Sequence, residues 1–401
     1  MSKVVMIWLD AFSSTYVDPQ KTPFISELCR SGLYTDLKSL FAFSGIGVSA
    51  FTGIAVNTHK VWCDCVLRES KPPSAAFAKS LSLCGKLPDD TLEAYARNIV
   101  CRIFGYNPGI PNQIPVELVN LFETKEKERL TNKNPVPGSV TLFDQLRQCE
   151  VKYFVVGFYE SLLEKLIVSR ALRALDKDYR FILFHLGSLD RLGHKFGPES
   201  PEIRKRLGEL DELVKKVMQK GIDLNPSTHF IIFSDHGMVP VERQINLMDA
   251  LERLPIKMGE DYILFLNSTV ANFWFKSQKG KSLIVEALGK IEPGAILDRA
   301  KLKELKIDKV GAEYGELFFA LKEGNVFFPD FYRRRKPPKG MHGYAFSTYD
   351  NPPFVIYSPD ISAKLNQGSE AEFIDVMPTI LDLLNLPIPP SCEGKSLLKS
   401  D

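Results

Sequence analysis

The sequence predicts an α/β fold in which a mostly parallel central sheet is covered by helices on both faces. Short apolar runs alternate with helical patterns along much of the 401 residues, and this alternation is typical of layered α/β domains. Three of the apolar runs also end at or near an aspartate, namely Asp10, Asp190 and Asp235. Because open α/β sheets bind ligands beyond the carboxyl ends of their strands, this agreement indicates where a site would lie.

The expected strands are short and apolar, and the expected helices carry apolar residues at helical spacing. The strands are predicted at residues 4–9, 153–156, 181–186, 229–233 and 354–357. The helices are predicted from residue 22 onward, with Pro23 in the first turn, and at 162–172, 201–220 and 373–386. Polar loop residues are expected after the strand at 181–186, so Asp190 and His194 are expected in a loop.

Two regions interrupt the alternation. Residues 61–138 lack a strand–helix repeat and are interpreted as a helical or irregular insertion. Residues 254–338 contain short strand-like stretches and one helix, which indicates a small α+β cap insertion. We therefore expect a single catalytic domain over residues 1–401, with both insertions covering the site.

The bulk composition is that of an ordinary globular protein, with 44% hydrophobic residues and a net charge of +2. Such a balance argues against a protein held to polymeric nucleic acid or to a membrane surface by charge alone. No run approaches the roughly 18 apolar residues of a membrane span, and no signal-peptide pattern is found. The expectation is a cytoplasmic protein.

The seven cysteines are scattered and odd in number, which does not indicate a disulfide framework. The sequence predicts no oligomeric state.

The residues that carry chemistry are three aspartates and three histidines: Asp10, Asp190, His194, Asp235, His236 and His342. Carboxylate oxygen and imidazole nitrogen are the usual ligands of catalytic zinc, and they also suit manganese. Six ligands are enough for two metals, with positions left open for substrate and water. Each residue alone has an ordinary explanation, such as a strand-end cap for Asp10 or a turn histidine for His342. Their joint presence carries the prediction.

The chain resembles the alkaline phosphatase superfamily and, within it, the type I phosphodiesterase and nucleotide pyrophosphatase branch. The matching stretches, in the family's order, are 8–10, 51–53 with His59 downstream, 190–198, 233–238, 341–344, and 375–381 followed by Pro387 and Gly394. Each motif alone is weak, but the ordered set spans nearly the whole chain. The resemblance implies an alkaline-phosphatase-like three-layer sandwich with inserted cap segments.

The resemblance also implies a ligand set for two divalent ions, with Zn²⁺ expected and Mn²⁺ as the alternative. Asp190, His194 and His342 would hold one metal. Asp10, Asp235 and His236 would hold the other, which also contacts the nucleophile. The partner would be a small phosphorylated substrate, such as a phosphodiester, a nucleotide or a nucleotide sugar.

In this family the nucleophile is a serine or threonine upstream of a pair that matches Thr52-Gly53, and Ser44 is the candidate. The sequence departs from the pattern here, because an ungapped count falls on Phe43 and the asparagine that often follows the nucleophile is absent. Ser49 is the alternative, although a residue packed beneath the site is the simpler interpretation of it.

Further substrate contacts are expected around the nucleophile and His342. Gly45 and Gly47 would free backbone N–H groups near a helix start, which suits an anionic oxygen. Arg335 belongs to a basic run shortly before His342 and would grip an anionic substrate. Tyr344 would line the pocket or only pack the loop.

The expected function is hydrolysis of a phosphodiester or a nucleotide pyrophosphate through a phosphoserine intermediate. A phosphomonoesterase or a phosphotransferase of the same superfamily is the alternative within the enzymes. A non-catalytic metal-binding scaffold is the alternative outside them, and the position of Phe43 leaves it open.

Overall fold

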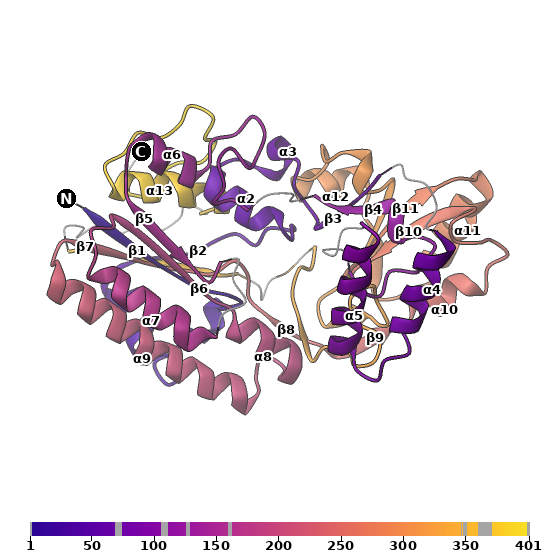
Figure 1. Ribbon diagram of the computed structural model, residues 1–401, viewed down its shortest axis with the longest axis horizontal. Helices are drawn as coiled ribbons and strands as arrows, with labels where there is room; N and C mark the ends of the chain where they lie inside the picture. Colours follow the sequence, from indigo (N-terminus) through magenta and orange to yellow (C-terminus); the bar gives the residue numbers. More distant parts are fainter. Residues whose placement is uncertain are drawn as a thin grey trace.

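The computed structural model describes residues 2–68, 74–105, 111–125, 129–158, 163–345, 347, 351–359 and 371–398. These residues form two lobes (Figure 1). The larger lobe holds a six-stranded sheet, and the smaller lobe holds a four-stranded one, within the described ranges. The two sheets and their helices confirm the predicted α/β class.

The large sheet has the strand order β2-β16-β7-β1-β6-β5. Its strands are β1 (Lys3–Leu9), β2 (Leu33–Asp36), β5 (Tyr153–Val156), β6 (Phe181–Leu186), β7 (Thr228–Phe233) and β16 (Pro353–Tyr357). β7, β1, β6 and β5 run parallel, whereas β16 is antiparallel to both of its neighbours. Leu9 lies opposite Leu186, and Trp8 lies opposite Phe233. The carboxyl ends of β6, β1 and β7 therefore lie side by side, facing the small lobe (Figure 1).

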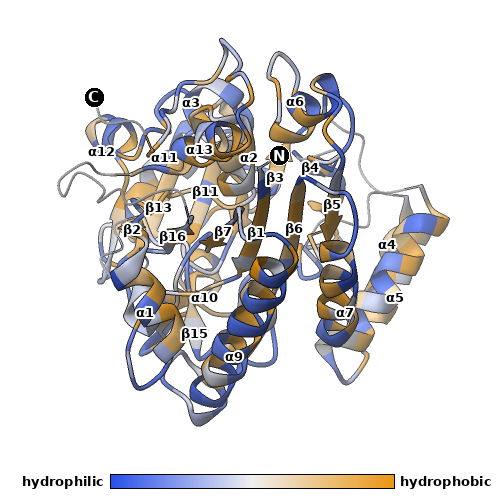
Figure 2. Ribbon diagram, turned by 90° about the vertical axis from the view of Figure 1, so that its left-hand side faces the viewer, coloured by the Kyte–Doolittle hydropathy of each residue, from blue (hydrophilic) through white to orange (hydrophobic). Residues whose placement is uncertain are grey.

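Helices cover both faces of this sheet, which makes three layers (Figure 1). One face carries α1 (Pro23–Ser31), α7 (Glu164–Leu175) and α9 (Pro201–Leu224), and the other carries α2 (Gly45–Thr52), α6 (Leu142–Gln148) and α13 (Val376–Leu383). Side chains alternate along a strand, so successive residues of β1 enter different apolar clusters: Met6 packs with one and Ile7 with the other. This two-sided burial explains the continuous apolar runs (Figure 2).

The small lobe contains parts of both predicted insertions. Its sheet contains β10 (Tyr262–Leu266), β11 (Val270–Phe275), β12 (Gly294–Ile296) and β13 (Leu317–Leu321), in the order β10-β11-β13-β12. The first insertion adds β3 (Cys65–Leu67), α4 (Ala75–Cys84), α5 (Asp90–Ile103) and β4 (Phe122–Thr124). The Phe122 and Phe265 rings lie 5.2 Å apart within one shared apolar cluster. We call this lobe the cap.

The remaining elements are α3 (Val56–His59), α8 (Ser188–Phe196), β8 (Val239–Pro240), β9 (Arg243–Ile245), α10 (Leu247–Glu252), α11 (Gln278–Leu288), α12 (Arg299–Glu304), β14 (Asn325–Phe327) and β15 (Gly340–Met341), with short 3₁₀ turns at Ser14–Tyr16, Val119–Leu121, Ala312–Tyr314 and Phe373–Asp375. The helix expected over 373–386 is therefore a 3₁₀ turn followed by the shorter α13. In the part of the chain that the structure describes, no helix combines the length and apolarity of a membrane span.

One expectation was wrong: the segment after β6 is the helix α8 and not a loop. Gly193 in its middle disfavours a helix on propensity alone. The glycine allows close packing, because a Cβ at position 193 would lie 2.9 Å from Cε and 3.1 Å from Cγ of Met238. The helix places Asp190 and His194, four residues apart, on the same face.

The start of α1 depends on a side chain from α9. Asp211 is buried, and its carboxylate accepts hydrogen bonds from the backbone N–H groups of Phe24 (3.0 Å) and Ile25 (2.8 Å). Thr22 at the N-cap position makes no side-chain capping bond. Asp211 therefore satisfies helix N–H groups that have no acceptor within the helix.

Replacing Asp211 with alanine should destabilise the large lobe. A buried donor left unpaired costs roughly 1–3 kcal/mol, so we expect the free energy of unfolding to fall by about 2–4 kcal/mol. Urea denaturation followed by circular dichroism measures this. Asp223→Ala, an exposed site on the same helix, should change the free energy by less than about 0.5 kcal/mol. Equal effects at the two positions would contradict the capping role.

Candidate metal centre and active site

The three strand ends bring the predicted ligands together. Asp10 follows β1 directly, Asp235 follows β7 by two residues, and Asp190 lies on α8 just after β6. In the first group, the ligand atoms of Asp190, His194 and His342 all lie within 4.8 Å of one another. His194 Nε2 is 3.1 Å and His342 Nε2 is 3.5 Å from Asp190 Oδ1. This group has the composition of a three-ligand metal site.

The second group shares a member with the first. Ligand atoms of Asp10, Asp190 and His236 also lie within 4.8 Å of one another. His236 Nε2 is 3.5 Å from Asp10 Oδ1 and 3.5 Å from Asp235 Oδ2. All six residues singled out in the sequence are thus adjacent, with Asp190 between the two groups. Their role as metal ligands stays a prediction.

His342 belongs to a segment that follows the cap in the sequence and returns to the other ligands. β15 pairs with β8, so that Met341 lies opposite Val239. This pairing sets His342 beside the loop of His236, and the two rings stack with their centroids 3.6 Å apart. The return of the chain from the cap therefore completes the centre.

The hydrogen bonds of the histidines show that the donor set fits cations. His194 Nδ1 lies 2.8 Å from the carbonyl of Gly340, and His236 Nδ1 lies 2.9 Å from the carbonyl of Gly237. A carbonyl oxygen only accepts, so each Nδ1 carries the proton, and Nε2 of a neutral ring presents a lone pair. Asp190 Oδ1 is buried and lies 3.1 Å from His194 Nε2 and 3.5 Å from His342 Nε2. Carboxylate oxygens and lone pairs converging in this way are stabilised by a cation between them.

The charges of the centre shift its pKa values in opposite directions. Burial lowers the pKa of His342 well below its ordinary value, and neighbouring His236 adds to this effect. Burial alone would raise the pKa of Asp190, but the histidines around it outweigh burial and hold the pKa below the usual range. Burial and the nearby Asp10 raise the pKa of Asp235. Such opposed shifts in one cluster are typical of functional sites.

Ser44 stands at the N-cap position of α2, with its hydroxyl oxygen buried. Its neighbour Phe43 packs on Gly343, where an added Cβ would lie 2.8 Å from the ring, so Ser44 is near the His342 loop. Gly45 is required by packing, because a Cβ there would lie 2.2 Å from the carbonyl oxygen of Val61. Gly45 and Gly47 occupy the first turn of α2, where backbone N–H groups lack acceptors within the helix.

The alternative nucleophile, Ser49, is engaged elsewhere. Its hydroxyl lies 2.9 Å from His59 Nε2, while His59 Nδ1 accepts from the backbone N–H of Val61 at 3.0 Å. Nε2 therefore carries the proton and donates to Ser49. Burial lowers the pKa of His59 to about 4, so the ring is neutral near pH 7 and serves packing beneath α2.

Sequence reasoning missed Asp64 and Tyr332. The hydroxyl of Tyr332, on the cap, donates to Asp64 Oδ2 at 3.2 Å. Burial raises the pKa of Asp64, and contacts with Tyr332 and Ser44 partly offset that rise. A carboxylate thus faces the candidate nucleophile. The residue spacing around Asp64, in residues 62–66, could not have indicated this contact, because the contact depends on how the two insertions fold.

His185 was also missed. Inside an apolar strand it suggested a core histidine, but its Nε2 lies 3.0 Å from Asp10 Oδ2. Burial alone would lower its pKa, yet the interaction with Asp10 raises it. The register of β1 on β6, with Trp8 opposite His185, sets this ring beside the end of β1. The contact with His185 thus helps to position Asp10, one of the predicted ligands.

The two remaining predicted substrate contacts are Arg335 and Tyr344. Arg335 Nη1 pairs with Glu93 on α5 at 2.8 Å, and its Nη2 donates to the carbonyl of Leu87. These contacts tie Arg335 to the cap, and its role as a substrate contact stays a prediction. Tyr344 is buried and lines, with Ser49, a hollow of about 420 Å³ that none of the six ligands lines.

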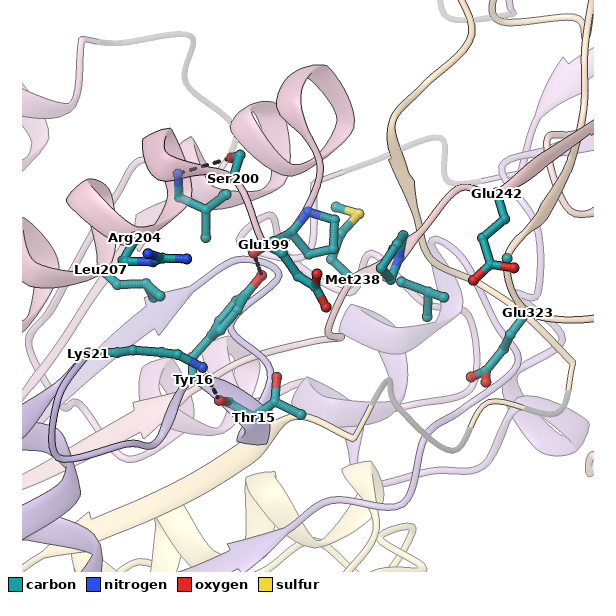
Figure 3. A pocket seen from close by; sticks show the side chains of 15 residues that line it. Thr15, Tyr16, Lys21, Glu199, Ser200, Arg204, Leu207, Met238, Glu242 and Glu323 are labelled. Carbon is teal, nitrogen blue, oxygen red and sulfur yellow. Dashed lines mark hydrogen bonds between the residues drawn. The ribbon is translucent and has the colours of Figure 1, made fainter.

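A larger hollow of about 720 Å³ has Met238 among its lining residues (Figure 3). The Tyr16 hydroxyl donates to the carbonyl of Pro198 at 3.1 Å along its wall, and Glu199, Glu242 and Glu323 contribute charge. None of the predicted site residues lines it. Volume alone would therefore misplace the site, and we locate it where the ligands converge.

Comparisons with known proteins agree with this geometry. A sequence profile of the type I phosphodiesterase / nucleotide pyrophosphatase family matches residues 114–371, well over half of the chain. GPI ethanolamine phosphate transferase 3 from Schizosaccharomyces pombe is 23% identical over 202 residues, which is 50% of this chain and 20% of that protein. Human ectonucleotide pyrophosphatase/phosphodiesterase family member 7 is 31% identical over 83 residues, or 20% and 18% of the two chains. The chain thus matches about a fifth of the length of these curated relatives.

A solved structure has the same fold over almost the full length. Murine ectonucleotide pyrophosphatase / phosphodiesterase 5, in an inactive form in complex with AMP, superposes with a TM-score of 0.70 at 16% identity, covering 97% of this chain and 96% of that one. This confirms the predicted alkaline-phosphatase-like fold. With the profile match over 114–371, it follows that the chain belongs to the type I phosphodiesterase / nucleotide pyrophosphatase family.

Proposed function

We propose that this protein is a two-metal-dependent hydrolase that cleaves a phosphodiester or a nucleotide pyrophosphate, with Ser44 as the nucleophile. The observation that carries the proposal is the convergence of six carboxylate and imidazole ligands at the ends of β6, β1 and β7. Bound divalent ions would lower the pKa of a coordinated hydroxyl and offset charge on the transferring phosphoryl group. Zn²⁺ is the expected metal and Mn²⁺ the alternative, because the ligands suit both.

The chain's own residues supply the rest of the reaction. Ser44 attacks phosphorus and forms a phosphoserine, and the bond to the leaving alcohol or phosphate breaks. The first-turn N–H groups of α2, at Gly45 and Gly47, suit the anionic oxygens of the phosphoryl group. Water then cleaves the phosphoserine and restores the Ser44 hydroxyl. The burial of Ser44 Oγ supports a nucleophile shielded from bulk water.

A phosphotransferase is the second candidate, because the fission-yeast relative is named a transferase. The phosphoserine would be the same, and an alcohol in place of water would accept the phosphoryl group. The two activities differ only in the acceptor, so product analysis in the presence of an alcohol such as glycerol separates them.

Metal-stripped protein restored with Zn²⁺ or Mn²⁺ tests the proposal. We expect metal-dependent release of p-nitrophenol from bis-p-nitrophenyl phosphate, faster than from p-nitrophenyl phosphate. A preference for the monoester would move the assignment to a phosphatase. A protein that binds two metals and turns over neither ester, with or without glycerol, would be a scaffold and would refute the proposal.

A further inference from the structure

The helix α5 of the cap has its charged side buried and its apolar side exposed. On the buried side, the side chains of Arg97 and Glu93 are only 9% and 0% exposed, and Arg97 Nη1 lies 3.5 Å from Glu93 Oε1. The opposite side carries large apolar residues, each between 53% and 73% exposed: Leu92, Tyr95, Ile99 and Ile103. A surface helix ordinarily turns its apolar side to the core and its charges to water. Packing within the cap therefore does not account for the outer face of α5.

These four exposed residues form one row, which we call the α5 stripe. They follow one another at intervals of three, four and four residues, so their side chains lie on one face of the helix. The row is about 17 Å long, at a rise of about 1.5 Å per residue. Leu83, at the end of the neighbouring α4, is also 56% exposed. Single exposed apolar residues are common, but a continuous row of them marks an interaction surface.

The α5 stripe lies on a projecting part of the molecule. α4 and α5 lie side by side on the outside of the cap (Figures 1 and 2). Phe77 of α4 packs on Phe104 with the ring centroids 5.4 Å apart, and Arg334 and Arg335 pair with Glu93 at 3.0 and 2.8 Å. These contacts fix α5 from its inner side. None of the hollows of about 720, 470 and 420 Å³ has a residue of the α5 stripe in its lining, so the stripe suits a flat partner better than an inserted peptide.

The exposed charges around the α5 stripe are mainly positive. Among the described side chains of α4, α5 and the turn between them, the exposed charged residues are Lys79, Lys86, Asp89 and Arg102. Exposed apolar residues flanked by lysine and arginine are typical of helices that lie in the interface of a membrane, and anionic phospholipids attract such cations. A second copy of the chain would instead bring the same cations together, which disfavours self-association through this face.

We propose that the α5 stripe docks the cap onto the surface of a membrane that contains anionic phospholipids. The aliphatic side chains of Leu92, Ile99 and Ile103 would enter the boundary of the acyl chains. The Tyr95 ring has a polar hydroxyl and suits the headgroup level, where the flanking cations would also lie. Apolar contact and charge act together here, because a net charge of +2 is too small to hold the protein by charge alone. The inference is independent of the proposed hydrolase activity.

Sedimentation of the full chain with lipid vesicles tests this docking. The vesicles consist of phosphatidylcholine alone or of phosphatidylcholine and phosphatidylserine in equal amounts. Ile99→Ser/Ile103→Ser removes half of the α5 stripe, and we expect it to weaken binding by about 10- to 100-fold, since burial of each isoleucine contributes roughly 10-fold or more. Leu166→Ser/Leu224→Ser, at two exposed leucines of the large lobe, is the matched control and should bind like the wild type.

Two further variants separate the charge from the insertion. Lys79→Gln/Lys86→Gln should weaken binding to the phosphatidylserine vesicles by about 10-fold or more, at roughly fivefold per cation, and should leave binding to phosphatidylcholine alone unchanged. Tyr95→Trp places a fluorophore in the α5 stripe. Brominated acyl chains should quench its fluorescence if the stripe enters the membrane.

Three results would overturn the proposal. The first is a wild type that sediments with neither kind of vesicle. The second is equal binding by the wild type and Ile99→Ser/Ile103→Ser, which would mean that charge alone holds the protein. The third is a dimer in analytical ultracentrifugation that Ile99→Ser/Ile103→Ser dissociates and that binds no vesicles, because a second copy would then cover the stripe. Thermal unfolding checks that each variant is folded, and unquenched Tyr95→Trp fluorescence would contradict the insertion even if a serine variant did not fold.

Discussion

Ser44→Ala is expected to lower turnover of bis-p-nitrophenyl phosphate by about 10³-fold or more, because no phosphoserine can form. The substitution removes one buried hydroxyl, which faces the carboxylate of Asp64 and none of the six ligands. The fold and the six ligands should therefore be unaffected. Steady-state kinetics and metal content by elemental analysis measure the two effects on the same sample. Loss of turnover with two metals still bound would establish Ser44 as the nucleophile.

Ser49→Ala is the matched control on the same helix. It removes the acceptor for His59 Nε2, so stability should fall by about 1–3 kcal/mol, while turnover at a permissive temperature should stay within about threefold of the wild type. The reverse pattern, with Ser49→Ala inactive and Ser44→Ala active, would transfer the nucleophile to Ser49. The position of Phe43 in the family register would then be explained by a different alignment of α2.

Asp190→Ala should have the second large effect. Asp190 belongs to both candidate ligand groups, so its loss should weaken the binding of both metals at once. The transition-state stabilisation that metals supply is several kcal/mol, or about 10³-fold in rate. We expect a fall of that order in kcat/KM, together with a fall in bound metal after dialysis. Excess Zn²⁺ or Mn²⁺ should restore activity only in part.

Asp178→Asn serves as the comparison, because this aspartate is 88% exposed and pairs with Lys152 at the surface. Its metal content and kinetics should match the wild type. If Asp190→Ala retained both metals and full activity, the shared position of Asp190 would have no functional meaning, and the two-metal proposal would lose its central residue.

Much of the large lobe could be predicted from the sequence because its strands are buried on both faces. Residues 4–9 and 181–186 are continuous apolar runs, and such runs have few alternatives in a layered fold. The carboxyl ends of the runs at 4–9 and 229–233 locate Asp10 and Asp235 without further information. The helix α8 was missed because Gly193 lowers helix propensity, and its packing on Met238 is visible only in three dimensions.

The contacts made by the cap were beyond sequence reasoning for a different reason. Tyr332 meets Asp64 across 268 positions of sequence, and no local pattern encodes such a pairing. The same holds for Arg335. Its positive charge suggested a contact with an anionic substrate, but its guanidinium forms an ion pair with the buried Glu93. Periodicity reports which face of an element is buried, and it does not report which distant segment covers that face.

The return of the chain through β15 has a consequence for biosynthesis. The ligands run from Asp10 to His342, and His342 stacks on His236 only after β15 has paired with β8. A ribosome must therefore pass His342, and the cap must be in place, before the first ligand group is complete. Metal would enter late, into an almost finished molecule, and its binding energy would favour the joined lobes over any state in which they have come apart.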